Sequence, residues 1–174
     1  MKTNNFSEEF FASVREIEIW KRLSNGCGFH WSETLIDCYQ DKIDWKSFSE
    51  NDYVPWTASI LEKYKNKLDW NALSSRSRKG LYSSANLKRF SSKWNWSEIT
   101  RNSSVDWTME KVEEFKDFID WGEMINMWCC HLYTLEFFEK YKEYFPAASL
   151  QQSSLWNTIL EIYTDKLAEQ ILAQ

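Results

Sequence analysis

Apolar residues recur along this chain with a period of 25 or 26 residues. One series has tryptophan at every position, and a second series beside it mixes tryptophan with phenylalanine and leucine. A fixed period of this length is typical of repeat proteins in which each repeat covers the apolar face of its neighbour. The first series is Trp20, Trp45, Trp70, Trp96 and Trp121, and the second is Phe6, Trp31, Trp56, Leu81, Trp107 and Leu132.

The repeat at residues 56–80 predicts a helix followed by a shorter helix. Thr57 can cap the first helix and Asp69 the second, because their side-chain oxygens can accept hydrogen bonds from free backbone amides. Apolar residues then lie on one face of each helix, at i, i+1, i+4 and i+8 in the first and at i and i+3 in the second. These residues are Ile60, Leu61, Tyr64 and Leu68, followed by Trp70 and Leu73. The same caps are predicted in other repeats at Ser32, Thr108, Asp44, Asn95 and Asp120.

The sequence therefore predicts an all-α fold, an α-solenoid of about six 25-residue repeats with a C-terminal capping helix. The predicted repeats of this single domain, 1–174, are 6–30, 31–55, 56–80, 81–106, 107–131 and 132–156, with the cap at 157–174. Whether residues 6–30 form a true repeat or an N-terminal cap is left open. The cap is predicted to bury one face, which carries Leu155, Ile159, Leu160, Tyr163, Leu167, Ile171 and Leu172.

A leucine-rich-repeat horseshoe is the main alternative, because its repeats have 20–29 residues. Such repeats require apolar residues at intervals of 3 and then 2 along a strand. Ile43, Trp45 and Phe48 instead give intervals of 2 and 3, and Asp44 stands where a helix cap belongs. The spacing therefore favours helices.

Two segments, DKIDWKSFSENDYVPW at 41–56 and NKLDWNALSSRSRKG at 66–80, carry the pattern DK-x-D-W-x-x-L-S-x-N-x-x-x-x-W in whole or in part. They resemble Trp-rich repeats found in uncharacterised bacterial and giant-virus proteins. The resemblance covers residues 31–80 well and 81–131 partly, and it implies an α-helical repeat scaffold without defined chemistry. Leu81 replaces the tryptophan that opens a repeat, and Arg76 stands where Asn51 stands one repeat earlier.

Composition bears on the packed core, the disulfides and the cellular location of the protein. Hydrophobic residues make up 43% of the chain and aromatic residues 17%, which is enough for a packed interior. Four cysteines in a chain of 174 residues do not indicate a disulfide framework. The N-terminus has no apolar stretch followed by a cleavage site, and no apolar run approaches the roughly 20 residues that span a bilayer. We therefore expect a cytoplasmic protein without a membrane segment.

Candidate catalytic and metal-binding residues are few. The Asp-Trp pairs are interpreted as helix caps beside packed tryptophans, because Asn95 occupies the same position and cannot act as an acid or base. Cys27 with His30, and Cys129-Cys130-His131, contain residue types that bind zinc, but they lie four repeats apart. An enzyme that uses Cys130 and His131 is the least favoured alternative. We expect no catalytic residue, no metal and no cofactor.

Charge is the one property that breaks the period. The net charge is −5, yet residues 71–106 carry seven basic and two acidic side chains, a net of +5. The basic side chains could bind phosphates or an acidic protein surface, or they could form a solvated face that pairs with the acidic flanks. We refer to these residues as the basic block: Arg76, Arg78, Lys79, Lys88, Arg89, Lys93 and Arg101.

The leading functional hypothesis is a non-enzymatic scaffold that binds a protein partner along one face of the solenoid, with the basic block as the predicted site. An inhibitor or immunity-type protein is one specific form of this hypothesis. The acidic C-terminal third is a competing surface for a basic partner. Nucleic-acid binding through residues 76–101 is the alternative, although the overall acidity of the chain (isoelectric point about 5.2) argues against it. Self-association is left open.

Overall fold

The computed structural model describes residues 7–26, 28–78, 80–127 and 131–173. These residues form helices, turns and loops and contain no strand, which confirms the predicted all-α class and excludes a leucine-rich-repeat horseshoe for the described part of the chain. None of the described helices is both long and apolar enough to cross a bilayer.

The chain divides into two compact units, Met1–Trp94 and Asn95–Gln174. We call them the N-terminal unit and the C-terminal unit and describe each by itself. The helices of the N-terminal unit are α1 (Glu8–Asn25), α2 (Glu33–Tyr39), α3 (Trp45–Ser49), α4 (Ala58–Tyr64), α5 (Trp70–Ser75) and α6 (Ser84–Arg89). Those of the C-terminal unit are α7 (Trp96–Arg101), α8 (Met109–Phe115), α9 (Trp121–Met124), α10 (Leu135–Tyr141), the 3-10 turn η1 (Lys142–Tyr144), α11 (Ala147–Leu150) and α12 (Ser154–Leu172).

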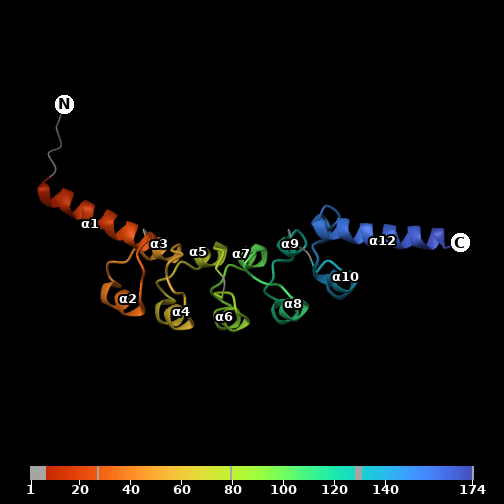
Figure 1. The fold of residues 1–174 in the computed structure, drawn as a ribbon, viewed down its shortest axis with the longest axis horizontal. Helices are drawn as coiled ribbons and strands as arrows, with labels where there is room; N and C mark the ends of the chain where they lie inside the picture. Colours follow the sequence, from red (N-terminus) through yellow and green to blue (C-terminus); the bar gives the residue numbers. More distant parts are fainter. Residues whose placement is uncertain (1–6, 27, 79, 128–130, 174) are drawn as a thin grey trace, which may run out of the picture. The chain divides into compact units, whose positions relative to one another are not determined.

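Within the N-terminal unit, the first helices of the repeats form one row and the second helices form another (Figure 1). Helices α2, α4 and α6 lie in the first row, and α1, α3 and α5 lie in the second, where α3 contacts both of its neighbours. In the C-terminal unit, α7 contacts α9 in the same way.

Two kinds of cap start these short helices. A Ser or Thr side chain accepts the backbone amide three residues later at the start of α2, α4, α6, α8 and α10, and an Asp or Asn side chain does so at α3, α5, α7 and α9. Helix α11 differs, because it begins after Pro146 without a side-chain cap. The caps predicted from the sequence are confirmed at Ser32, Thr57, Thr108, Asp44, Asp69, Asn95 and Asp120.

Each tryptophan of the first series packs on an aromatic ring at the end of the following first helix. Four of these tryptophans begin a second helix, and Trp20 lies within α1. Trp45 shows the arrangement: its ring centroid lies 4.9 Å from that of Tyr64, and its indole N–H donates to the carbonyl oxygen of Gln40 at 3.0 Å. The period of 25 residues therefore reflects an aromatic contact between consecutive repeats. The equivalent ring pairs are Trp20 with Tyr39, Trp70 with Phe90, Trp96 with Phe115, and Trp121 with Tyr141.

A buried hydroxyl follows four of these five tryptophans, four residues later in the chain, and its hydrogen bonds can join consecutive repeats; Ile125 stands at this position after Trp121. The Ser49 hydroxyl donates to the carbonyl oxygen of Trp45 at 2.7 Å and accepts the backbone N–H of Asp69 at 2.9 Å. Ser24 and Thr100 make the two equivalent bonds in their own repeats. The Ser74 hydroxyl donates to the carbonyl oxygen of Trp70. All four side chains are fully buried, so each hydroxyl satisfies backbone groups that water cannot reach.

Leucine replaces the tryptophan of the second series in two repeats, and the following tyrosine supplies the missing donor. Trp31 donates its indole N–H to the carbonyl oxygen of Leu23 at 3.2 Å. In the repeat that begins with Leu81, the Tyr82 hydroxyl donates instead to the carbonyl oxygen of Leu73 at 2.6 Å. The pair Leu132 and Tyr133 repeats this exchange, since Tyr133 donates to Met124 at 2.8 Å. The repeat at 81 keeps its junction despite its divergent sequence.

The two ends of the described chain differ from the interior. Residues 8–25 form one continuous helix, α1, instead of a helix pair. At the other end, the first turns of α12 are fixed: Leu155 and Ile159 are buried, and the Leu155 N–H donates to the carbonyl oxygen of Ile125 at 3.0 Å. The prediction of a capping helix that buries one whole apolar face is wrong beyond these turns. Its exposed apolar side chains are Leu160, Tyr163, Leu167, Ile171 and Leu172.

Candidate functional site

Arg78 belongs to the interior of the N-terminal unit, so the prediction that it binds a partner is wrong for this residue. It is only 8% exposed. Its Nη2 donates to the carbonyl oxygen of Ser49 at 2.9 Å, and its guanidinium lies 5.2 Å from the ring centroid of Trp56. Burial lowers the pKa of Arg78, and the nearby carboxylate of Asp52 opposes this shift. The side chain holds two repeats together.

Arg78 also corrects the alignment of the repeats made from sequence. Asn51 donates its Nδ2–H to the carbonyl oxygen of Ser24 at 2.8 Å, one repeat before the bond from Arg78 to Ser49. The sequence aligned Arg76 with Asn51, but the side chain that takes over the bond to the preceding repeat comes from Arg78, two positions later. Arginine can do this because its side chain is longer than that of asparagine.

Two more residues of the basic block bind acidic side chains of their own unit. The Nε of Arg89 on α6 lies 3.1 Å from Oε2 of Glu62 on α4. Arg101 on α7 forms a bidentate ion pair with Glu98 in the same helix, and this ion pair raises the pKa of Arg101. Arg101 belongs to the C-terminal unit, whereas Arg89 belongs to the N-terminal unit. Thus Arg78, Arg89 and Arg101 each face a different carboxylate.

The remaining four residues of the basic block are Arg76, Lys79, Lys88 and Lys93, and they differ in how exposed they are. Lys88 and Lys93 are exposed, and Arg76 is half-buried. The backbone carbonyl of Arg76 accepts a hydrogen bond from the Tyr82 hydroxyl. Lys79 lies outside the described residues. The exposed cations of the block in the N-terminal unit are therefore fewer than the sequence suggested.

Acidic side chains on the first helices accept bonds from the next first helix in the row. In the N-terminal unit, Asp37 on α2 accepts the Tyr64 hydroxyl of α4, and its Oδ1 lies 2.5 Å from Nζ of Lys63. Lys63 and then Tyr64 hold the pKa of Asp37 below its usual value. Burial, with the contact to Asp37, raises the pKa of Tyr64.

The same arrangement recurs in the C-terminal unit. Glu113 on α8 accepts the Tyr141 hydroxyl of α10 at 3.0 Å, and its Oε2 lies 3.1 Å from Nζ of Lys140. Lys116, Lys140 and Tyr141 lower the pKa of Glu113 to about 2. Lys88 occupies the equivalent position of the sequence, so part of the basic block is a charge reversal at one repeat position.

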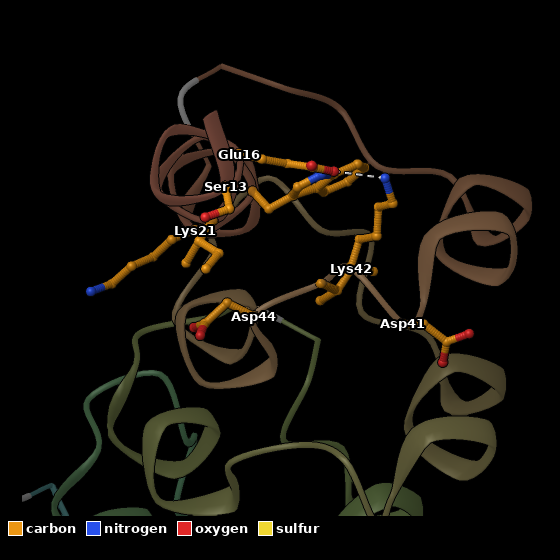
Figure 2. Close-up of a pocket in the computed structure, with 9 residues that line it drawn as sticks. Ser13, Glu16, Lys21, Asp41, Lys42 and Asp44 are labelled. Carbon is orange, nitrogen blue, oxygen red and sulfur yellow. Dashed lines mark hydrogen bonds and ion pairs between the residues drawn. The ribbon is translucent and has the colours of Figure 1, made fainter. Parts of the chain in front are cut away.

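A cavity of the N-terminal unit lies between α1 and the turn that joins α2 to α3 (Figure 2). It has a volume of about 400 Å³. Lys42 bridges it, with Nζ 2.8 Å from Oε1 of Glu16 and 5.5 Å from the ring centroid of Trp20. The Lys42 contact lowers the pKa of Glu16. The other lining residues are Ser13, Ile17, Lys21, Asp41, Ile43 and Asp44.

Several polar side chains that line this cavity are held by local contacts. The Ser13 hydroxyl donates to the carbonyl oxygen of Phe10 at 2.8 Å, and no histidine or cysteine lines the cavity. The Asp44 carboxylate accepts the backbone amide of Ser47 as a helix cap, which lowers its pKa. An apolar side chain could lie against Ile17 and Trp20.

A second cavity, of about 390 Å³, adjoins Arg78 and is lined by Trp56 and Ser77. The Nη1 atom of Arg78 is buried and has no hydrogen-bond partner among the described residues. Because this atom is enclosed by protein, the cavity does not present it to a ligand from solvent.

The cysteine and histidine candidates do not assemble into a described site. Cys27, Cys129 and Cys130 lie outside the described residues. The ring of His30 packs against Tyr53, and Nε2 of His131 lies 3.0 Å from the carbonyl oxygen of Trp107. Across residues 7–26, 28–78, 80–127 and 131–173, no three His, Cys, Asp or Glu side chains are grouped so that they could hold a metal ion.

Exposed apolar side chains on the two terminal helices are the feature that the sequence analysis missed. On α1, Val14 and Ile17 are 41% and 66% exposed, and on α12, Leu160 and Leu167 are 46% and 57% exposed. Contiguous apolar surface of this kind commonly marks a protein-binding site. The sequence signal was present as an amphipathic pattern, but that pattern does not say whether a neighbour covers the apolar face.

Comparisons with known proteins leave the resemblance to Trp-rich repeats as a prediction. No protein-family model, no curated protein and no solved structure matches this chain.

Proposed function

We propose that the chain is an α-solenoid of helix-pair repeats that acts as a non-enzymatic scaffold and binds a protein partner. Support comes from contacts that recur at the repeat period: the ring pair of each tryptophan in the first series, the buried hydroxyl, and the acid on α2, α4 and α8 that accepts from the next first helix. Solenoids present extended surfaces to other proteins. The resemblance to Trp-rich repeats points the same way.

The observation that carries the proposal is the contrast between charged side chains that have partners and apolar side chains that are exposed. In the basic block, Arg78 is buried, while the side chains of Arg89 and Arg101 are each 55% exposed but form ion pairs within their own units. On α12, Leu160 and Leu167 are about half exposed. We therefore move the proposed binding surface from the basic block to the terminal helices.

The proposed setting is the cytoplasm, and an inhibitor or immunity-type role is one form that such a scaffold could take. Nucleic-acid binding is disfavoured as the second function. The charges that would bind phosphates are partly neutralised by Glu62 and Glu98, and the chain as a whole carries a net charge of −5.

The test is capture of partners from cells that naturally contain the protein, with the full tagged chain and two variants. One variant, Leu160→Glu with Leu167→Glu, alters the exposed face of α12. The control variant, Lys88→Glu with Lys93→Glu, alters exposed members of the basic block and leaves Arg78 in place. Each capture is run with and without nuclease, and circular dichroism confirms that both variants are folded.

A protein that is retained after nuclease treatment, lost with the α12 variant and kept with the control variant would support the proposal. Nucleic acid that is lost with the Lys88 and Lys93 variant, and whose binding weakens steeply with salt, would overturn it in favour of the alternative. Capture that neither variant changes would reject α12 as the binding surface.

A further inference from the structure

The first helices of consecutive repeats are joined by a directional contact. One helix supplies a carboxylate, and the next supplies a tyrosine hydroxyl and a lysine, as in Asp37 with Tyr64 and Lys63. Glu113 with Tyr141 and Lys140 makes the same contact. A helix in such a row therefore has a donor side, which faces the preceding repeat, and an acceptor side, which faces the next repeat.

Helix α2 presents the tyrosine of this donor side to solvent, while Cys38 stands where Lys63 and Lys140 stand in their repeats. Its tyrosine, Tyr39, stands where Tyr64 and Tyr141 stand in their repeats. The Tyr39 ring packs on Trp20, with centroids 5.3 Å apart, but its hydroxyl donates no hydrogen bond to any described residue. Tyr39 is 43% exposed, whereas Tyr64 is 3% exposed. The donor lacks the carboxylate that its equivalents have.

Helix α10 presents the acceptor side. Glu139 stands where Asp37 and Glu113 stand in their repeats. Glu139 is exposed. Its Oε2 lies 2.9 Å from Nζ of Lys142, three residues later in the chain. No tyrosine hydroxyl donates to Glu139 among the described residues. The acceptor lacks the donor that its equivalents have.

An exposed apolar stripe lies beside each open contact. Ile17 lines the cavity of Figure 2 together with Trp20, the residue on which Tyr39 packs. We call Val14, Ile17 and Tyr39 the N-terminal face. At the other end, Phe138, the chain neighbour of Glu139 on α10, packs on Trp156 near the start of α12, with ring centroids 6.0 Å apart.

The α12 stripe has a spacing of 3, 4 and 4 residues, so its members lie along one side of the helix. This spacing is that of a seam between two helices. We call this stripe, together with Glu139, the C-terminal face. The stripe consists of Leu160, Tyr163, Leu167 and Ile171, which are 46% to 62% exposed.

We propose that the partner of these faces is a second copy of this chain: the C-terminal face of one copy docks on the N-terminal face of another, with Glu139 accepting the Tyr39 hydroxyl. The inference rests on the proposed function and names its partner. Complementarity of the two ends carries it, since one end holds an acceptor without its donor and the other a donor without its acceptor. Because the faces differ, the contact is heterologous and leaves one free face at each end of a dimer.

The test uses the purified full chain, whose mass is measured by light scattering over a range of concentrations. Ile17→Glu blocks the N-terminal face, and Leu167→Glu blocks the C-terminal face. Each variant alone should remain monomeric, while an equal mixture of the two should form a dimer and grow no further. The wild-type protein should exceed the mass of a dimer as its concentration rises, because every complex keeps two free faces.

Several outcomes would overturn the inference. A wild-type protein that stays monomeric at every concentration would reject it. A wild-type dimer that does not grow, together with self-association of the Ile17→Glu variant alone, would identify a symmetric contact through α12 instead. Val14→Glu and Leu160→Glu provide a second pair of blocking variants in case one of the first pair fails to fold, which circular dichroism reports.

The hydrogen bond is tested separately. Tyr39→Phe should weaken self-association by roughly tenfold, and Glu139→Gln should weaken it by less, because a carboxamide oxygen still accepts the hydroxyl but carries no charge. The double variant should be no weaker than Tyr39→Phe alone, because that change already removes the donor to position 139. Independent, multiplicative losses would mean that these side chains do not meet. Glu143→Gln, an exposed carboxylate near Glu139, serves as the control.

The result also separates this inference from the proposed function. If the purified protein is monomeric but captures a different protein through Leu160 and Leu167, the second copy is rejected as the partner and the scaffold function stands. If it neither associates with itself nor captures a protein, both proposals fail.

Discussion

Helices α4 and α12 have similar amphipathic patterns, but the apolar residues are buried in α4 and largely exposed in α12. The apolar residues Ile60, Leu61 and Tyr64 of α4 are buried, because α2 and α6 lie on either side of it (Figure 1). Beyond Ile159, Ile162 of α12 is half-buried, and the stripe from Leu160 to Ile171 is exposed. An amphipathic pattern therefore identifies the side of a helix that can be covered, while the fold decides whether it is covered. Apolar surface remains exposed where a helix has no neighbour to cover it.

The largest difference between interior and end should appear on truncation of apolar side chains. Trp70 is 8% exposed and contacts the rings of Phe90 and Trp94, so Trp70→Ala should lower the free energy of unfolding by about 3–5 kcal/mol. Leu167→Ala, on exposed α12, should change it by less than about 0.5 kcal/mol. Urea unfolding followed by circular dichroism measures both.

The control for Trp70 is its neighbour Asp69. The Asp69 side chain only caps a helix, accepting the amides of Asn71 and Ala72, and asparagine caps nearly as well. Asp69→Asn should therefore be mild. Equal losses for Asp69→Asn and Trp70→Ala would contradict the assignment of the repeat period to aromatic packing.

A smaller loss is expected when an interior cation is removed. Arg78→Met should cost about 1.5–3 kcal/mol, because the charged guanidinium bond to the buried carbonyl of Ser49 is lost. Lys93→Met, at an exposed position of the same basic block, should have no measurable effect on stability. Unfolding free energies of the two variants test whether the block is one functional surface or a mixture of structural and exposed residues.

Removal of a buried hydroxyl should also lower the stability of an interior repeat. Ser49→Ala leaves the amide of Asp69 and the carbonyl of Trp45 without their shared partner and should cost about 1–2 kcal/mol. Ser49→Thr should be nearly neutral, because Thr100 makes both bonds in its own repeat. If threonine proved as damaging as alanine, the hydroxyl would not be the important group.

The smallest effect concerns pH. The pKa of Glu113 is lowered to about 2, so its folded-state pKa lies below its unfolded value. The stability that it contributes is complete above the usual glutamate pKa and is lost as the pH falls from there toward 2. Glu113→Gln should therefore destabilise the protein at neutral pH, and the difference from wild type should shrink as the pH falls through this window. Urea unfolding across a pH series shows whether the difference shrinks.

Lys140→Met provides the matched control, because it removes one of the cations that lower the pKa of Glu113. It should remove part of the same pH dependence. A difference between wild type and Glu113→Gln that is constant from neutral pH to pH 2 would mean that the Glu113 contacts do not contribute to stability.

The sequence predicted local structure well because local structure depends on residues close together in the chain. Thr57, Asp69 and Trp70 were placed correctly as caps and as an interior aromatic, since capping and helical faces are decided within a few residues. The hydroxyl of Ser49 was missed, because a buried serine and an exposed one look alike in a single sequence.

The candidate site was predicted less well, because it depends on contacts between repeats. Arg78 was assigned to a partner-binding surface, yet it reaches back to Ser49 in the preceding repeat. Leu167 was assigned to a covered face, yet no neighbour covers it. Both errors come from inferring the surroundings of a side chain from its residue type and period alone.

The central claim is that interior side chains maintain the fold while terminal apolar side chains are available for binding. The most direct test measures unfolding free energy and protein binding together for two variants, Leu160→Glu with Leu167→Glu and Arg78→Met. The account predicts that the first variant loses binding and keeps its stability, whereas the second loses stability and, under conditions where it is folded, still binds. A stable Arg78→Met protein that no longer binds, or an α12 variant that binds as well as wild type, would contradict it.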